Sequence, residues 1–173
     1  MNFYELAKSR YSVRSFQEKP VPQEEIDRLI QISHLAPTGC NLQPQRILIL
    51  NEKEALEKLK ECTNSHFNAP LAMLICYHKE EGWTRRYDGA ISAPVDCSIV
   101  ATHIMLGAWE LGIGSCWVMS FDPQKMRQNF NIPPELEPVA LLVMGYPAKD
   151  SVPNPRHTQV RPIKDIISYN RFD

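Results

Sequence analysis

The sequence contains no run of about 18 apolar residues, and its amino terminus lacks the basic, apolar and small-residue pattern of a secretory signal. These absences argue against a membrane span and against export, so we expect a cytoplasmic protein. The net charge of −1 provides no basic surface for a nucleic acid or an anionic membrane. We therefore expect neither of them as a partner.

The five cysteines form no C-x-x-C pair, and the five histidines form no H-x-x-H or H-E-x-x-H array. An odd number of cysteines without a signal segment indicates reduced, mostly buried thiols. Because this spacing supplies no set of ligands for zinc, we expect no metal site.

The motifs of several enzyme classes are also missing. The chain has no G-x-x-x-x-G-K-[ST] phosphate loop and no G-x-S-x-G nucleophile elbow. Gly112 and Gly114 do not form a dinucleotide motif, because they end a predicted helix, whereas that motif follows a strand and opens a helix. Paired carboxylates such as Glu24 and Glu25 lie on polar faces. The sequence therefore offers no dedicated catalytic acid, base or nucleophile.

The 173 residues fit a single domain, 1–173, with no linker and no internal repeat. Residues 94–111 form a helix candidate that is apolar on nearly every side, which indicates burial in a core or in a subunit interface. Asp96 suits the positive end of this helix's dipole. Apolar spacing and caps predict further helices at 2–9, 23–36, 52–62 and 122–130. Apolar runs predict strands at 46–50, 71–77, 115–118 and 139–146.

The stretch Arg10–Phe16 combines two guanidinium groups with a hydroxyl. In an extended chain Arg10, Ser12 and Arg14 point to one side, with about 7 Å between successive side chains. Such an edge suits a phosphate, which arginine holds bidentately while serine adds a neutral donor. A solvated basic turn between two helices is the alternative for this stretch taken by itself.

Two loops complete the set of candidate segments. The loop Ala36–Pro44 has breakers at both ends and offers backbone donors, a hydroxyl and two amides next to a predicted buried strand. It is placed to bind a ligand, although a plain connection fits the same pattern. Residues 79–90 are polar, with aromatic and arginine side chains interleaved, and we interpret them as a mobile excursion or a lid. The tail at 162–169 is predicted to be a small helix or an extended arm.

In the order of the chain, four segments resemble the nitroreductase family of FMN enzymes. They are Arg10-x-Ser12-x-Arg14-x-Phe16, the loop Ala36–Pro44, Leu106–Trp117 (LGAWELGIGSCW) and Met144–Pro147. The resemblance spans nearly the whole chain. It implies an α+β fold in which a central mixed, mostly antiparallel sheet is flanked by helices. It also implies an intertwined homodimer with one FMN in each of two clefts at its interface.

The resemblance further implies which residues bind the cofactor. Arg10 and Ser12 would hold the FMN phosphate with Tyr11 nearby, and Arg14 would reach the ribityl chain and the pyrimidine edge of the flavin. The loop would pack on the flavin from the other subunit, and its implied cofactor-binding residues are Pro37, Thr38, Gly39 and Asn41.

The flavin ring would be lined by the segment that follows the helix and its glycine turn: Trp117, Val118, Met119 and Ser120. The backbone at either of the last two would face the flavin nitrogen that accepts hydride. In the tail, Arg161 would add to the phosphate site, with Arg156 as the alternative. The family's asparagine contact to the ring edge would be Asn64, Asn68 or neither.

The implied activity is the transfer of two electrons from NAD(P)H, a diffusible co-substrate, through FMN to a small electron-poor acceptor such as a nitroaromatic, a quinone or an enone. FMN would carry the chemistry, so no catalytic side chain is expected. One narrow site for both reactants predicts ping-pong turnover. The alternatives are a non-catalytic FMN-binding protein, a family branch with other flavin chemistry such as reductive dehalogenation, and an anion-binding domain without flavin.

Overall fold

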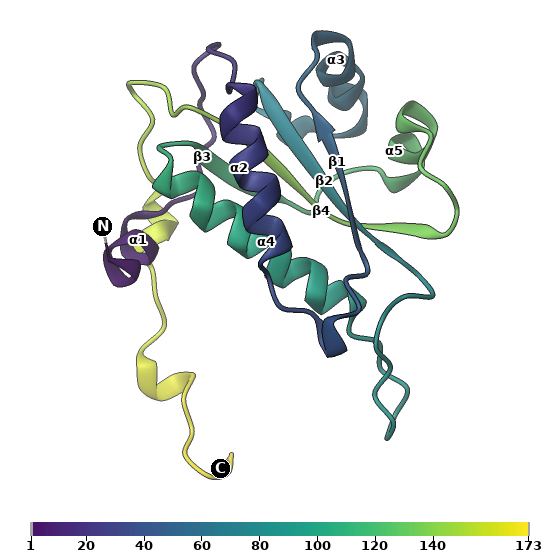
Figure 1. Cartoon of the computed structure of the whole chain (residues 1–173). Helices are drawn as coiled ribbons and strands as arrows, with labels where there is room; N and C mark the ends of the chain where they lie inside the picture. The colour runs from purple at the N-terminus through teal and green to yellow at the C-terminus, as the bar shows by residue number, and fades with distance from the viewer. Residues whose placement is uncertain (1, 173) are drawn as a thin grey trace.

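Four antiparallel strands form the central sheet of the computed structural model, which describes residues 2–172 (Figure 1). The strands are β1 (Gln45–Leu50), β2 (Leu71–His78), β3 (Gly114–Val118) and β4 (Leu136–Gly145), and their order in the sheet is β1-β2-β4-β3. Residues 71–76 of β2 and 140–145 of β4 are apolar and buried, as expected for central strands that are covered on both faces. This sheet, with helices on both sides, confirms the α+β prediction.

The helices cover the two faces of the sheet in pairs (Figure 1). On one face lie α2 (Gln23–His34) and α4 (Ala93–Glu110), and on the other lie α3 (Lys53–Cys62) and α5 (Pro123–Phe130). Side chains of β2 alternate between the two cores, so that Met73 packs toward α2 and α4 while Leu74 packs toward α3 and α5. The short helix α1 (Phe3–Ser9) lies outside these layers near the end of α4.

Local side-chain caps explain where two of the helices begin. The Asn2 side chain accepts a hydrogen bond from the Glu5 amide at 3.0 Å and so caps α1. The Asp122 side chain accepts from the Gln124 and Lys125 amides at 2.9 and 3.1 Å, with Pro123 as the first residue of α5. Both starts agree with the sequence prediction.

The longest helix, α4, contributes many of the buried side chains in the core on its own face of the sheet. Val100, Ala101 and Ile104 are completely buried against the sheet, whereas Val95 on the outer side remains 60% exposed. Gly107 lets α2 approach closely, since a Cβ atom there would lie 2.5 Å from Ile32 Cδ1. One face of α4 therefore packs within the chain and another is left uncovered.

Residues 79–92 form a short hairpin that protrudes beyond the end of β2 (Figure 1, lower right). A bridge joins Thr84 to Ile91, and Arg85 pairs with Asp88 across the turn, where Nε and Oδ1 are 2.7 Å apart. After β4, the tail runs past α1 and away from the sheet as an extended arm with short 3-10 turns at Pro155–Thr158 and Ile163–Asp165 (Figure 1).

Residues 2–172 contain neither a membrane-spanning helix nor a metal-binding cluster of side chains. No helix there is both long and apolar enough to cross a membrane. No group of three or more His, Cys, Asp or Glu side chains in that range is arranged to hold a metal ion.

Candidate functional site

The segment Arg10–Phe16 is extended and lies along the edge strand β3. A parallel bridge joins Ser12 to Ser115, and the Val13 amide donates to the Ser115 carbonyl at 3.0 Å. Val13 is completely buried, so Ser12 and Arg14 on either side of it face outward. The alternation predicted from the sequence is thus present.

Gly114 makes this close docking possible. A Cβ atom at this position would lie 2.5 Å from Val13 Cγ2 and 3.0 Å from Pro147 Cγ. Any larger residue at the start of β3 would therefore push the segment away from the sheet edge. Gly114, which does not belong to a dinucleotide-binding motif, therefore has a packing role at the site.

A cavity of about 410 Å³ opens beside this segment, and its lining residues are Ser12, Arg14, Asn154, Arg156 and His157. None of these five is acidic. Arg10, at the start of this segment, is not among the lining residues, and its Nη1 atom is buried without a hydrogen-bond partner among residues 2–172. Burial raises the pKa of the Cys116 thiol, and the nearby Arg14 and Arg10 guanidinium groups act to lower it, which places both cations around the same part of β3. A cavity lined by Arg14 and Arg156 and by no acidic residue suits an anion.

Tyr11, next to Ser12, connects its own segment to helix α4 and to the tail. Its hydroxyl donates to the Ser151 carbonyl at 3.2 Å, and its ring packs edge-on against Trp109 of α4 with the centroids 5.3 Å apart. The ring also contacts His157, at 6.4 Å between centroids. Tyr11 thus fixes the tail against the segment that carries Ser12 and Arg14.

Of the two arginines proposed from the tail, Arg156 lines the cavity, whereas Arg161 lies farther along the exposed arm. Asn154 and His157 also line the cavity, and sequence reasoning missed both. The sequence does contain one feature that could have indicated them: the pair Asn154-Pro155, which is typical of a turn. In the structure, the Asn154 side chain accepts from the Arg156 amide at 3.0 Å and turns the tail toward the cavity.

The loop Ala36–Pro44 is held at the other end of α4. The buried carboxylate of Asp96, only 3% exposed, accepts from the Gly39 amide at 2.9 Å and from the Ser92 hydroxyl at 2.7 Å. Thr38 Oγ1 accepts from the Gln43 amide at 3.1 Å. Sequence reasoning gave Asp96 only a helix-dipole role and missed its bond to the loop.

Within one chain the loop does not reach the basic cavity. Gly39 lies against Asp96 in the first turn of α4, and Tyr11 lies against Trp109 in the last turn. With a rise of about 1.5 Å per residue, these two positions on the helix are roughly 20 Å apart. The structure thus brings Ser12 and Arg14 together with Arg156 at one cavity, with Tyr11 packed against His157 and Arg10 near Cys116 of β3. It leaves the loop residues at a second location: Pro37, Thr38, Gly39 and Asn41.

The segment predicted to line a flavin ring lies at the end of β3. Val118 is buried in the core on the α3 and α5 side, so only its backbone is available to a ligand, whereas Met119 is 63% exposed. The Thr63 hydroxyl donates to the Ser120 carbonyl at 2.5 Å and fixes this segment to the end of α3. Asn64 follows directly in the chain.

Asn68, the other asparagine considered from the sequence, lines a different cavity of about 630 Å³ beside α3. Lys53, Lys60 and His66 line the same cavity together with Glu18. Asn64 is exposed and directly follows Thr63, whose hydroxyl is bonded to the Ser120 carbonyl.

The chain is similar to known proteins in both sequence and fold. The sequence matches the family model described as "Nitroreductase family" over residues 7–74 and 64–146. The crystal structure of a nitroreductase family protein of Clostridium difficile 630 has 43% sequence identity and a TM-score of 0.93, and the match covers 99% of this chain and 100% of that one.

Two further relatives carry more specific names. An FMN-dependent nitroreductase of another Clostridium difficile strain is 26% identical with a TM-score of 0.80, covering 98% of this chain and 100% of that chain. An NADPH-dependent oxidoreductase of Staphylococcus saprophyticus is 23% identical over 187 residues, covering 98% of this chain and 74% of that protein. The match to the family model spans most of the chain, and we conclude that the chain belongs to the nitroreductase family.

Proposed function

We propose that the chain is an FMN-dependent oxidoreductase that passes two electrons from NAD(P)H to a small electron-poor acceptor, such as a nitroaromatic, a quinone or an enone. The observation that carries this proposal is the basic cavity beside Ser12, together with the unpartnered Nη1 atom of Arg10. The names of the relatives support both FMN and the nicotinamide co-substrate. When bound, FMN would supply the hydride and electron-transfer chemistry.

The residues around the cavity fit the phosphate of FMN. Arg10 and Arg156 offer charge-assisted hydrogen bonds, and the Ser12 hydroxyl adds a neutral donor. Arg14 is exposed, and its Nη1 donates only to the Ser12 carbonyl, at 3.2 Å, among the contacts in residues 2–172. Its remaining donors are free to face the pyrimidine edge, where a cation stabilises charge that develops on reduction.

We further propose a homodimer with sites shared between the subunits. The loop that would pack on the flavin lies about one helix length from the phosphate cavity of its own chain, so a second chain has to supply it. Val95 on α4 is exposed, and a shallow cavity of about 240 Å³ runs along that face. The tail also exposes apolar side chains that a partner would cover: Val152, Val160, Ile163, Ile166, Ile167, Tyr169 and Phe172.

The absorption spectrum of the purified protein tests the proposed function. We expect a band at about 450 nm from oxidised flavin, which NAD(P)H bleaches without oxygen and which the acceptor restores. Because both reactants would use one site in turn, bleaching should need no acceptor, and double-reciprocal plots should give parallel lines. A band that NAD(P)H never bleaches would indicate a non-catalytic FMN-binding protein. A protein that shows no band after incubation with FMN and removal of the unbound FMN by gel filtration would exclude a flavin function.

A further inference from the structure

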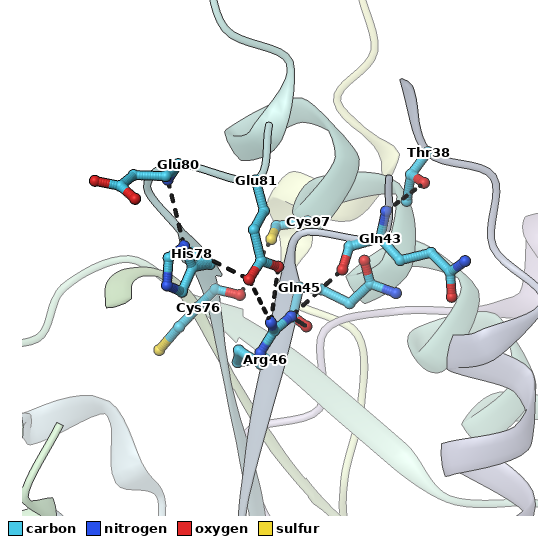
Figure 2. A network of polar contacts seen from close by, with 9 residues as sticks. All are labelled: Thr38, Gln43, Gln45, Arg46, Cys76, His78, Glu80, Glu81 and Cys97. Atoms are coloured by element: carbon cyan, nitrogen blue, oxygen red, sulfur yellow. Dashed lines mark hydrogen bonds and ion pairs between the residues drawn. The ribbon is translucent and has the colours of Figure 1, made fainter. Parts of the chain in front are cut away.

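Arg46, the second residue of β1, connects two segments that are distant in the sequence. Its Nη2 atom donates to the two carboxylate oxygens of Glu81 at 2.8 and 2.7 Å. Its Nη1 atom donates to the carbonyl oxygens of Gln45 at 3.0 Å and of Gln43 at 3.4 Å. Figure 2 shows the guanidinium group between Glu81 and the end of the loop. Arg46 therefore joins the base of the hairpin 79–92 to the loop 37–44.

The loop needs such support because its backbone is strained. Cys40, Asn41 and Gln43 have φ angles of 50°, 57° and 52°. Asparagine tolerates this left-handed region, whereas for residues such as Cys40 and Gln43 it costs about 1–2 kcal/mol. Gln43 is held from both sides, since its amide donates to Thr38 Oγ1 at 3.1 Å and its carbonyl accepts from Arg46 (Figure 2). Arg46 thus acts on Thr38 through one strained residue.

The other end of the hairpin holds the other end of the loop. The Ser92 amide donates to the Trp83 carbonyl at 2.8 Å, and the Ser92 hydroxyl and the Gly39 amide share the Asp96 carboxylate. The packing here is tight, because a Cβ atom on Gly39 would lie 2.8 Å from Ser92 Oγ and 3.1 Å from Trp83 Cβ. The loop is therefore held between the two ends of the hairpin.

Glu81 is itself held in place by the turn that starts the hairpin. Its amide donates to the His78 carbonyl at 3.2 Å, and the His78 amide donates to the Pro44 carbonyl at 2.8 Å. The side chains of Arg46 and Glu81 are 44% and 38% exposed, and a pair with this exposure adds little to the stability of a fold. Its removal should therefore change the geometry of the loop more than the stability of the sheet.

We propose that Arg46 and Glu81 are positioning residues, whose ion pair sets the loop 37–44 in the conformation that completes the flavin and acceptor site of the partner subunit. This inference rests on the proposed function and adds to it two residues that do not touch the cofactor. The pair acts through Gln43 on Thr38, while Asp96 acts separately on Gly39.

The test compares Glu81→Gln with Glu80→Gln, a matched control because Glu80 is adjacent and its side chain makes no ion pair within residues 2–172. Glu81→Gln is expected to raise both the FMN dissociation constant of the apoprotein and the KM for 1,4-benzoquinone by about three- to tenfold. The kcat at saturating FMN and the midpoint of thermal unfolding should stay close to wild type. Glu80→Gln should match wild type in all four measurements.

A double-mutant cycle separates positioning from a general loss of charge. If the pair acts as a unit, adding Glu81→Gln to Arg46→Gln should raise the FMN dissociation constant no further. Additive effects would overturn the proposal, as would Glu81→Gln values equal to those of Glu80→Gln. A lower unfolding temperature with unchanged FMN affinity and KM would also overturn it, because that result indicates a purely structural role. None of these outcomes bears on the proposed function, which stands if the wild-type protein binds FMN and NAD(P)H bleaches the bound flavin.

Discussion

Replacing Arg10 with alanine is expected to raise the dissociation constant for FMN by about ten- to a hundredfold. The variant loses one charge-assisted contact to the phosphate, worth roughly 1.5–3 kcal/mol. Arg10 Nη1 has no hydrogen-bond partner among residues 2–172, so the substitution removes no hydrogen bond made by this atom there. Fluorescence titration of the apoprotein with FMN measures the change directly.

Arg28→Ala is the matched control for this prediction. Arg28 is an exposed arginine on α2, away from the cavity lining, and its removal should leave the FMN affinity unchanged. If Arg10→Ala binds FMN as tightly as Arg28→Ala does, the stretch Arg10–Phe16 is a solvated basic turn, and the phosphate assignment is wrong.

Replacing Asp96 with alanine is expected to lower the free energy of unfolding by about 2–4 kcal/mol, because it leaves two donors without their acceptor in a buried region. These donors are the Gly39 amide and the Ser92 hydroxyl, at 2.9 and 2.7 Å. Release of Gly39 should also loosen the loop and weaken FMN binding. Urea unfolding gives the first quantity and FMN titration the second.

Two further variants show whether the loss comes from these hydrogen bonds. Asp96→Asn keeps an oxygen for the Gly39 amide, so it should lose less stability than Asp96→Ala. Asp27 is exposed on α2 and accepts only from Gln23 of the same helix, at 2.8 Å among the described contacts, so Asp27→Ala should change little. Equal losses in Asp96→Ala and Asp27→Ala would contradict the role assigned to Asp96.

Most of the fold was predictable because its elements are marked by local patterns. The apolar run that predicts a strand at 46–50 matches β1 within one residue, and α4 starts and ends within one residue of the predicted 94–111. The start of β4 was missed, since the strand begins at Leu136 rather than at 139. The boundary was missed because a proline usually argues against a central strand. Pro138 is tolerated here because it pairs with Cys76 at a register shift.

The candidate site was predictable only where its geometry is local. The outward direction of Ser12 and Arg14 follows from alternation along one extended segment. The bond between Asp96 and Gly39 and the pair of Arg46 with Glu81 join residues that only the packed fold brings together. The same limit applies to the tail, where a turn at Asn154 decides that Arg156 lines the cavity.

A mixed dimer tests most directly whether each site combines Arg10 of one subunit with the loop 37–44 of its partner. One subunit carries Arg10→Ala, and the other carries Gly39→Val, whose added atoms would collide with Ser92 and Trp83. Two different affinity tags isolate the dimer that contains one subunit of each kind.

The measurement is the amount of FMN that the mixed dimer binds with wild-type affinity. Each variant homodimer should bind FMN weakly, because every one of its sites carries a defect. In the mixed dimer one site would carry both defects, and the other would combine an intact Arg10 with an intact loop. We therefore expect one tightly bound FMN per mixed dimer. A mixed dimer with no tight site would show that both contributions come from the same chain, and would contradict the shared site.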